Sequence, residues 1–424
     1  MHAPARPTIS APGPWTGARR IGFRFGFLCA LLLIAPFPLG WLPGTHWVPV
    51  VWLELWDMGV RWFATAILGI PAPVLAFTGS GDTTWHYVQL LLIGVLAGLG
   101  TVTWSVLDRK HRSYSRLASA LTVYLRYWLA FFLVLYGVLK IWYLQMSELT
   151  LGQLDQRVGD KSPMGMLWLF MSASKPYTMA TGFVEALAGV LLVWRRTTML
   201  GALLAIAAMT NVFVLNLCYD VPVKLFSLEL LLGAVAVAAP GGHRLLRAAL
   251  GHAVAEVPPR TRASARIEQL RRVAKRGLVV LLALPLVVMV RQDPRYRQHH
   301  HELHGIWVVE RFVADGVELP PLLSLGARWR KLLLGPDALT IRAMTDRRTS
   351  YRARVVPERG TIEVIVGGVP TSWRYRRLDA NDRTRLVIDG QLRGARLHVE
   401  LVQEPPPLLL TRGFHWIQEA PFHR

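Results

Sequence analysis

The chain has 424 residues, of which 52% are hydrophobic and 16 are Trp, and it carries a formal net charge of +21 at pH 7. This composition excludes an ordinary soluble enzyme, because several apolar runs approach the length needed to cross a bilayer. The positive charge is concentrated between those runs, which argues for a topology signal and against a nucleic-acid partner.

Seven apolar runs predict transmembrane helices. They cover residues 25 to 42, 86 to 107, 120 to 146, 177 to 194, 197 to 218, 221 to 239 and 274 to 290. Of the Lys and Arg residues that flank them, 19 fall on one side of the membrane and five on the other. By the positive-inside rule the N-terminus is cytoplasmic, so we expect a multi-pass protein of a bacterial inner (cytoplasmic) membrane, with the lipid bilayer as its first partner. The first run lacks a small-x-small cleavage site and predicts a retained anchor helix.

Residues 43 to 63 are too polar to cross the membrane but are rich in Trp. This pattern predicts a helix lying flat at the outer interface. The segment "FTGSGDTTWHY" (77 to 87) follows, and Gly79 and Asp82 stand just before the second span. We expect either a turn that caps a helix N-terminus or a backbone nest for an anionic or polar ligand.

Polar residues recur inside the central spans at a similar depth. Lys140, Glu185, Asn211 and Glu229 each lie about 9 to 13 Å from the outer end of their helix, at 1.5 Å per residue. Buried polar groups are costly in hydrocarbon, so these four should face one another, with Tyr136 and Tyr143 on the same helix face as Lys140. The cluster is either a site for a small molecule or a proton, or a structural salt bridge that joins the helices.

The turn between the fifth and sixth spans contains a second charged pair. Asp220 is a good N-cap residue and Pro222 is tolerated in a first helical turn, so the sixth helix should start at Asp220. Lys224, four residues on, should pair with Asp220 near the outer water.

The last apolar run decides the side of everything that follows it. From Gly277 to Val290 only fourteen residues are apolar, about 21 Å of helix against a hydrocarbon core of about 30 Å. With flanking cations snorkelling to the interface the run can cross, and we favour that interpretation. Seven crossings place the C-terminal domain in the periplasm, whereas six would leave it in the cytoplasm.

The segment "HHHELH" (299 to 304) resembles a zinc motif but has the wrong spacing. In H-E-x-x-H two His lie one helical turn apart, whereas here His304 follows His301 after only three residues. We favour a linker without metal; the less favoured alternative is a looser cluster of His299, His300, His301 and His304.

From about residue 305 the pattern changes to short alternating segments separated by turns. Period-two alternation with turns every 8 to 12 residues predicts an antiparallel barrel or sandwich. Gly305 and Trp307 form a G-x-W sequence at the first strand, and Arg412 falls in the last predicted strand. Residues 303 to 418 therefore resemble a lipocalin-like β-barrel, and the resemblance implies that Arg412 stacks on Trp307. We expect either a small apolar ligand or the protein's own side chains inside the barrel.

Residues 117 to 240 show a second resemblance. "RYWLAFFLVLYGVLKIWYLQM", "GFVEALAGVLLVW" and "YDVPVKLFSLELLL" are similar to the DoxX-like four-helix membrane bundle. The resemblance implies an inner-membrane protein, and a quinone is a possible ligand by resemblance alone. No cofactor is evident from the residues themselves, and the spans contain no pair of haem ligands.

These observations predict a multi-pass α-helical membrane protein of about seven transmembrane helices followed by an all-β antiparallel barrel. The expected parts are 1–116 (anchor, interfacial helix and second span), 117–240 (bundle), 241–276 (basic cytoplasmic linker), 277–298 (last span and tether) and 299–424 (barrel). The favoured function is binding or transfer of a small amphipathic molecule or proton at the polar cluster, beneath a periplasmic barrel. The alternative is a membrane scaffold whose barrel binds an envelope protein. An enzyme ranks third, because no nucleophile and base, phosphate loop or catalytic metal spacing is found.

Overall fold

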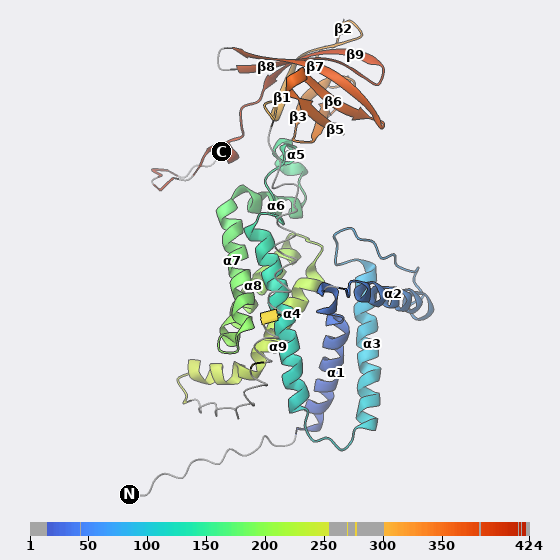
Figure 1. Ribbon diagram of the computed structural model, residues 1–424, viewed down its shortest axis with the longest axis vertical. Helices are drawn as coiled ribbons and strands as arrows, with labels where there is room; N and C mark the ends of the chain where they lie inside the picture. The colour runs from blue at the N-terminus through green and yellow to red at the C-terminus, as the bar shows by residue number, and fades with distance from the viewer. Residues whose placement is uncertain are drawn as a thin grey trace. The chain divides into compact units, whose positions relative to one another are not determined.

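The computed structural model describes residues 15–42, 44–253, 269, 276–277, 301–380, 383–413, 415–416 and 418–420. The chain divides into two compact units. The helical unit comprises Met1–Gln145 and Pro176–Val290, and the barrel unit comprises Met146–Lys175 and Arg291–Arg424 (Figure 1). Each unit has a hydrophobic core of its own.

Six helices in the described part of the helical unit are long and apolar enough to cross a bilayer. They are α1 (Gly17–Ile34), α3 (Thr84–Leu107), α4 (Ser115–Ile141), α7 (Lys175–Val193), α8 (Thr198–Cys218) and α9 (Lys224–Ala249). The apolar stretch of α1 continues to Trp41 through the short helix η1 (Leu39–Trp41). These helices fall on the first six predicted runs and identify a membrane-embedded unit. The predicted seventh run, 274 to 290, lies outside the described residues except at positions 276 and 277.

Small side chains allow the central helices to approach one another closely. Ala188 on α7, Ala202 and Ala205 on α8 and Ala234 on α9 are fully buried in one core cluster, together with Leu129 on α4. Interfaces built from such residues are typical of helices that associate within lipid, where close packing replaces the hydrophobic effect.

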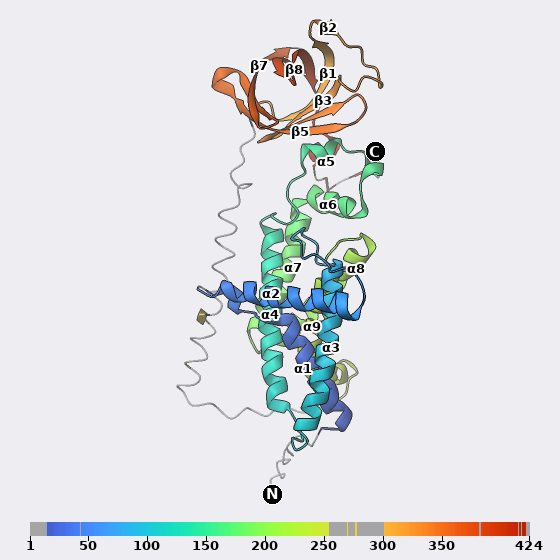
Figure 2. The same ribbon diagram turned by 90° about the vertical axis from the view of Figure 1, so that its right-hand side faces the viewer.

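The predicted interfacial segment forms helix α2 (Trp47–Trp62), which continues into a single π-helical stretch, η2 (Phe63–Ile67). Figure 2 shows α2 running across the direction of α1 and α3. Trp56 and Val60 pack into a core with Trp85 of α3, whereas Trp47 and Trp62 are exposed. One face of α2 is thus held by the helical unit and the other presents aromatic side chains of the kind that settle at a membrane surface.

Two helix ends differ from the sequence prediction. Helix α9 continues through Pro240 to Ala249, so the chain after residue 240 begins as helix and not as linker. Helix α4 ends at Ile141, and Tyr143 beyond it has a φ of 59°. Tyr143 therefore does not share the helix face of Tyr136 and Lys140, because a left-handed residue turns the chain away from the helix axis.

The C-terminal part of the barrel unit is a closed antiparallel β-barrel. Its strands are β1 (Gly305–Ala314), β2 (Val317–Glu318), β3 (Trp329–Leu334), β4 (Ala338–Ala343), β5 (Arg348–Val356), β6 (Thr361–Val366), β7 (Val369–Ala380), β8 (Arg383–Leu392) and β9 (Ala395–Gln403). Strands β1 and β3 to β9 pair in sequence order, and β1 pairs with β9 to close eight strands, while the two-residue β2 extends β1. Closure leaves these eight strands without a free edge.

Bulky side chains fill the core of the barrel. Trp307, Phe312, Trp329 and Trp373 are at most 4% exposed and belong to one core cluster. The Trp307 ring nitrogen donates to the Leu303 carbonyl at 2.9 Å. This side-chain core is one of the two interiors considered from the sequence.

Arg412 does not lie in the last strand as predicted. That strand, β9, ends at Gln403, and Arg412 follows the short helix α11 (Leu408–Thr411), where its guanidinium donates to the Gln418 side chain at 3.1 Å. The proline run at 405 to 407 ends the strand pairing before Arg412, because Pro cannot donate to a β-ladder.

The connection between α4 and α7 folds with the barrel. It contains α5 (Leu151–Asp155), η3 (Val158–Asp160) and α6 (Pro163–Ala173). Ser162 caps α6 by accepting from the Gly165 N–H, and Pro163 occupies its first turn. These signals stand in the sequence between two predicted spans, 120 to 146 and 177 to 194, where no helix was predicted.

Candidate functional site

Helices α4 and α7 touch through their backbones. A Cβ on Gly137 would lie 2.6 Å from the Gly182 carbonyl oxygen, and a Cβ on Gly182 would lie 2.6 Å from the Gly137 carbonyl oxygen. About two helical turns further along α7, a Cβ on Gly189 would lie 2.7 Å from the Ala130 carbonyl oxygen. Only glycine fits at these contacts, so the G-x-x-E-x-x-x-G pattern of α7 sets the approach of the two helices.

This close approach brings Lys140 and Glu185 into a buried ion pair. The Lys140 ammonium donates to Glu185 Oε1, and the two residues are 7% and 3% exposed. Glu185 Oε2 is buried and has no hydrogen-bond partner among the described residues. The pair lies next to the backbone contacts between α4 and α7, a position that fits an ion pair that joins the two helices.

A cavity of about 350 Å³ lies in the helical unit beside the pair. Its lining comes from α1, the loop before α3, α3 itself, α4 and α9: Leu33, Gly79, Ser80, Gly81, His86, Gln89, Leu90, Ile93, Tyr136, Val223, Leu225, Phe226 and Glu229. Tyr136 connects the two features, because it lines the cavity and its hydroxyl lies within electrostatic range of Glu185. Three of the residues singled out from the sequence, Gly79, Tyr136 and Glu229, therefore meet at one cavity.

Glu229 is the acidic group of this cavity. It lies on α9, five residues after Lys224, and no hydrogen bond or ion pair joins its carboxyl group to any residue that the structure describes. The lining contains no Lys or Arg. A carboxyl group in such surroundings needs a proton or a ligand to complete it.

Asp82 fixes the loop that covers one side of the cavity. Its two carboxylate oxygens accept the backbone N–H groups of Lys224 at 2.7 Å and Leu225 at 3.0 Å, and Gly81 N–H donates to the Pro222 carbonyl at 2.7 Å. Asp82 thus caps the N-terminus of α9 from 142 residues away along the chain. From the sequence, we expected Asp82 either to cap the helix that follows it, α3, or to form part of a ligand nest. In the structure Asp82 caps α9.

The predicted cap by Asp220 is wrong. Helix α9 begins at Lys224 with Val223 in the cap position, and Asp220 is an exposed residue with a φ of 51°. The ion pair expected in this turn is present, since Lys224 Nζ lies 2.9 Å from Asp220 Oδ1. Lys224 Nζ also lies 3.7 Å from Asp82 Oδ2, so both carboxylates neutralise one ammonium.

Two residues expected in the polar cluster lie elsewhere. Asn211 is exposed on α8, and the buried amide of that helix is Asn216, which donates to the Ser227 hydroxyl of α9 at 3.0 Å. Tyr143 lies past the end of α4, as described above. Asn211 was predicted from its depth along the helix, which does not give the direction in which a side chain points, and Tyr143 from helical spacing that ends before it.

The histidines of the segment 299–304 are only partly described, because His299 and His300 lie outside the described residues. The His301 ring is engaged at both nitrogens: Nε2 lies 2.8 Å from the Gly335 carbonyl oxygen, and Nδ1 accepts from the Leu303 N–H at 3.2 Å. Among the described residues no group of three or more His, Cys, Asp or Glu is arranged to hold a metal.

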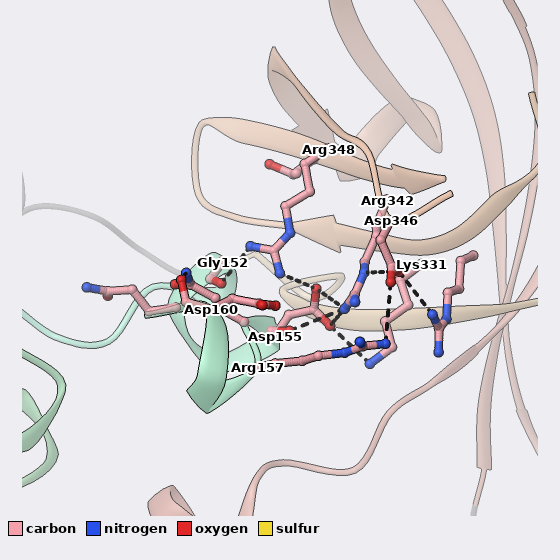
Figure 3. Close-up of polar contacts among 12 residues, drawn as sticks. Gly152, Asp155, Arg157, Asp160, Lys331, Arg342, Asp346 and Arg348 are labelled. Atoms are coloured by element: carbon pink, nitrogen blue, oxygen red, sulfur yellow. Dashed lines mark hydrogen bonds and ion pairs between the residues drawn. The ribbon is translucent and has the colours of Figure 1, made fainter. Parts of the chain in front are cut away.

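The barrel unit contains a charged cluster that the sequence did not reveal (Figure 3). Asp155, the last residue of α5, is buried and faces three cationic side chains of the barrel strands. Its carboxylate lies 2.9 Å from Arg342 Nη1, 3.0 Å from Arg348 Nη2 and 3.1 Å from Lys331 Nζ. Arg348 also donates to the Gly152 carbonyl at 3.1 Å.

A second carboxylate extends the same cluster. Asp346, in the turn after β4, accepts from Arg342 at 3.0 Å and from Arg330 at 2.9 Å. The hydrogen bond from Arg342 holds the pKa of Asp346 below its usual value. No signal in the sequence pairs Asp155 with Arg342, which is 187 residues away, so only the folded barrel unit shows the contact.

Together the two units define a membrane protein: a helical unit with a small, partly open cavity, whose Glu229 carboxyl group has no partner among the described residues, and a closed antiparallel barrel. Comparison with protein families finds no matching family model, and comparison with solved structures finds no match. The chain is 33% identical over 99 residues to the uncharacterized protein YwoB of Bacillus subtilis (strain 168). The match covers 23% of this chain and 62% of YwoB, so it spans less than two thirds of that relative.

Proposed function

We propose that this protein binds a small amphipathic molecule in the cavity of its helical unit. The observation that carries the proposal is the lining of that cavity, in which the carboxyl group of Glu229 and the polar groups of Tyr136 and Gln89 stand among leucine, isoleucine and valine side chains. Small-molecule sites have this composition: an apolar wall with a few polar groups that fix the orientation of the ligand.

The Lys140–Glu185 pair has a supporting role in this proposal. It lies under the glycine contacts of α4 and α7 and is not part of the cavity lining. We assign it to the packing of the two helices, which holds Tyr136 at the cavity wall. A quinone, which the resemblance to DoxX-like bundles implies, is one amphipathic molecule that a binding test should include.

The topology that we propose follows from which segments of the chain belong to the barrel unit. Residues 146–175 connect α4 to α7 and belong to the same unit as the barrel, to which Asp155 fastens them. Three helices, α7, α8 and α9, then cross the membrane, so α9 ends on the side opposite to residues 146–175. The chain between α9 and β1 has to return across the membrane, and the apolar run at 277 to 290 supplies a candidate for that crossing. The positive-inside rule makes the barrel periplasmic.

A second candidate function is that of a membrane scaffold whose barrel binds an envelope protein. The packed barrel core favours it, because an interior filled by Trp307, Trp329 and Trp373 leaves the outer surface for binding. Under this alternative the cavity would hold no specific ligand.

Binding of short amphiphiles to the full chain in lipid nanodiscs tests the proposal, with empty nanodiscs as the blank for partitioning. Ser80 lies on the loop at the cavity, and Ser80→Phe should fill part of the space and weaken binding at least about tenfold. Thr103→Phe adds the same ring at an exposed position of α3 and should leave binding unchanged. Equal binding by both variants, or none by the unmodified protein, would refute a site in this cavity.

A further inference from the structure

The two acidic residues of the six long apolar helices have different surroundings. Glu185 has the ammonium of Lys140 as its partner, whereas Glu229 has no partner among the described residues and faces the cavity. The nearest cation of α9, Lys224, is already paired with Asp220 and Asp82. The described lining therefore offers Glu229 no Lys or Arg, and His86, which also lines the cavity, has its ring Nδ1 2.8 Å from the Thr83 hydroxyl.

Two aromatic rings stand beside this carboxyl group in the same cavity. Tyr136 and Phe226 both line it, and their ring centroids are 6.0 Å apart. The face of an aromatic ring attracts a cation, and the attraction is strongest where water is excluded. A carboxylate with two rings is a combination suited to an ammonium group, which needs one opposite charge and several weakly polar neighbours.

The rest of the cavity suits a hydrocarbon portion. Leu33, Leu90, Ile93, Val223 and Leu225 form its apolar wall. Its volume of about 350 Å³ is at the lower end of ordinary ligand sites, which span about 300 to 1,000 Å³. The occupant is therefore small.

We propose that the cavity binds an amphipathic organic cation, a protonated amine or quaternary ammonium with a short hydrocarbon portion, whose charge lies against Glu229 and the rings of Tyr136 and Phe226. This inference rests on the proposed function, and it adds the charge and class of the ligand. The ammonium group can come from a free amine or from the headgroup of a membrane lipid.

Three probes of equal chain length separate charge from hydrophobicity: hexyltrimethylammonium, 1-hexanol and hexanoate. Their binding to the full chain is measured by titration calorimetry in phosphatidylglycerol nanodiscs, after subtraction of empty nanodiscs. The cation should bind at least about tenfold more tightly than the alcohol, and hexanoate should bind more weakly than either.

Two variants and one control assign the preference to the cavity. Glu229→Gln should bring the cation and the alcohol to within about twofold of each other while alcohol binding persists, which shows an intact cavity. Phe226→Leu keeps the carboxyl group and should reduce the preference for the cation. Glu54→Gln removes an exposed acid of α2 outside the cavity and should change nothing.

The outcomes distinguish the inference from the function on which it rests. If the alcohol binds as tightly as the cation, or if Glu229→Gln and Phe226→Leu leave the preference intact, the cation site is refuted while an amphiphile site remains. If no probe binds, both fail. With a confirmed preference, weaker binding of the cation in nanodiscs that contain phosphatidylethanolamine identifies the lipid headgroup as the occupant, and unchanged binding identifies a free amine.

Discussion

Single residues of the helical unit divide into those that pack helices and those that face the cavity. Lys140 and Glu185 pair with each other under the contacts of Gly137 and Gly182, whereas Glu229 lines the cavity without a partner among the described residues. The same residue types therefore have different roles, and the difference comes from the neighbours that the fold provides.

Replacing one member of the buried Lys140–Glu185 pair should lower stability more than replacing both. Lys140→Met and Glu185→Gln each leave one uncompensated polar or charged group in the helix interior and should lower stability by about 3 to 5 kcal/mol. The double variant should recover much of that loss, because neither charge remains. Unfolding in mixed micelles and the amount of protein in the membrane measure this, with Lys110→Met as an exposed control. Abundant, stable single variants with a growth defect would instead assign the pair to the functional site.

The cap that Asp82 provides can be tested separately from the cavity. Asp82→Ala removes the acceptor for the Lys224 and Leu225 N–H groups and should cost about 0.5 to 2 kcal/mol. Hydrogen exchange should accelerate at those amides first, since they lose their partner directly. Unchanged exchange at the start of α9 would show that the loop does not cap the helix in solution.

The sequence could predict depth in the membrane but not direction around a helix. Counting residues from the helix ends placed Lys140 and Glu185 at a similar level, and the structure brings them together. The same count failed for Asn211, which is exposed. The helical spacing used for Tyr143 also failed, because Tyr143 has a left-handed backbone conformation that the sequence does not announce. Asp82 reaches α9 through a contact that no local pattern encodes.

Elements were predicted best where one physical pattern dominates. Long apolar runs gave six helices, and period-two alternation gave the barrel strands, because burial alone determines both patterns. Helix α6 was missed although Ser162 and Pro163 mark its start, and α9 was ended too early at Pro240. The start signals of α6 held and were overlooked, whereas at Pro240 the local rule failed, since a proline can remain inside a helix that neighbouring helices support.

Helix α5 should be held to the barrel strands by Asp155. Asp155→Asn leaves Arg342, Lys331 and Arg348 without their shared carboxylate, and the like charges then repel one another. Protease cleavage between residues 146 and 162 should become at least about tenfold faster, because the segment opens more often. The matched control is Asp160→Asn, an exposed residue of the same segment. Equal cleavage of both variants would contradict a fastening role for Asp155.

The chain combines a membrane-embedded helical unit with a barrel unit, and the barrel unit includes the connection between α4 and α7. That arrangement ties the side of the barrel to the side of residues 146–175. The sequence alone left open on which side of the membrane the barrel lies, because that prediction depended on a run of only fourteen apolar residues.

A reporter of periplasmic location fused after Arg424 should be active, and a cytoplasmic reporter at the same point should be silent. A reporter inserted at the exposed Asp160 should give the same answer, since we place both positions on one side of the membrane. Opposite answers at the two positions would overturn the seven-crossing topology.

Photolabelling tests most directly whether the cavity beside Glu229 holds a ligand. The full chain in nanodiscs is irradiated with a hexylamine that carries a diazirine, and the labelled residues are mapped by mass spectrometry. We predict labels at Ile93 and Phe226, which line the cavity, and their loss when excess hexyltrimethylammonium is added. Labels confined to the exposed positions Leu99, Val102 and Leu232, unaffected by the competitor, would contradict a ligand site in the helical unit.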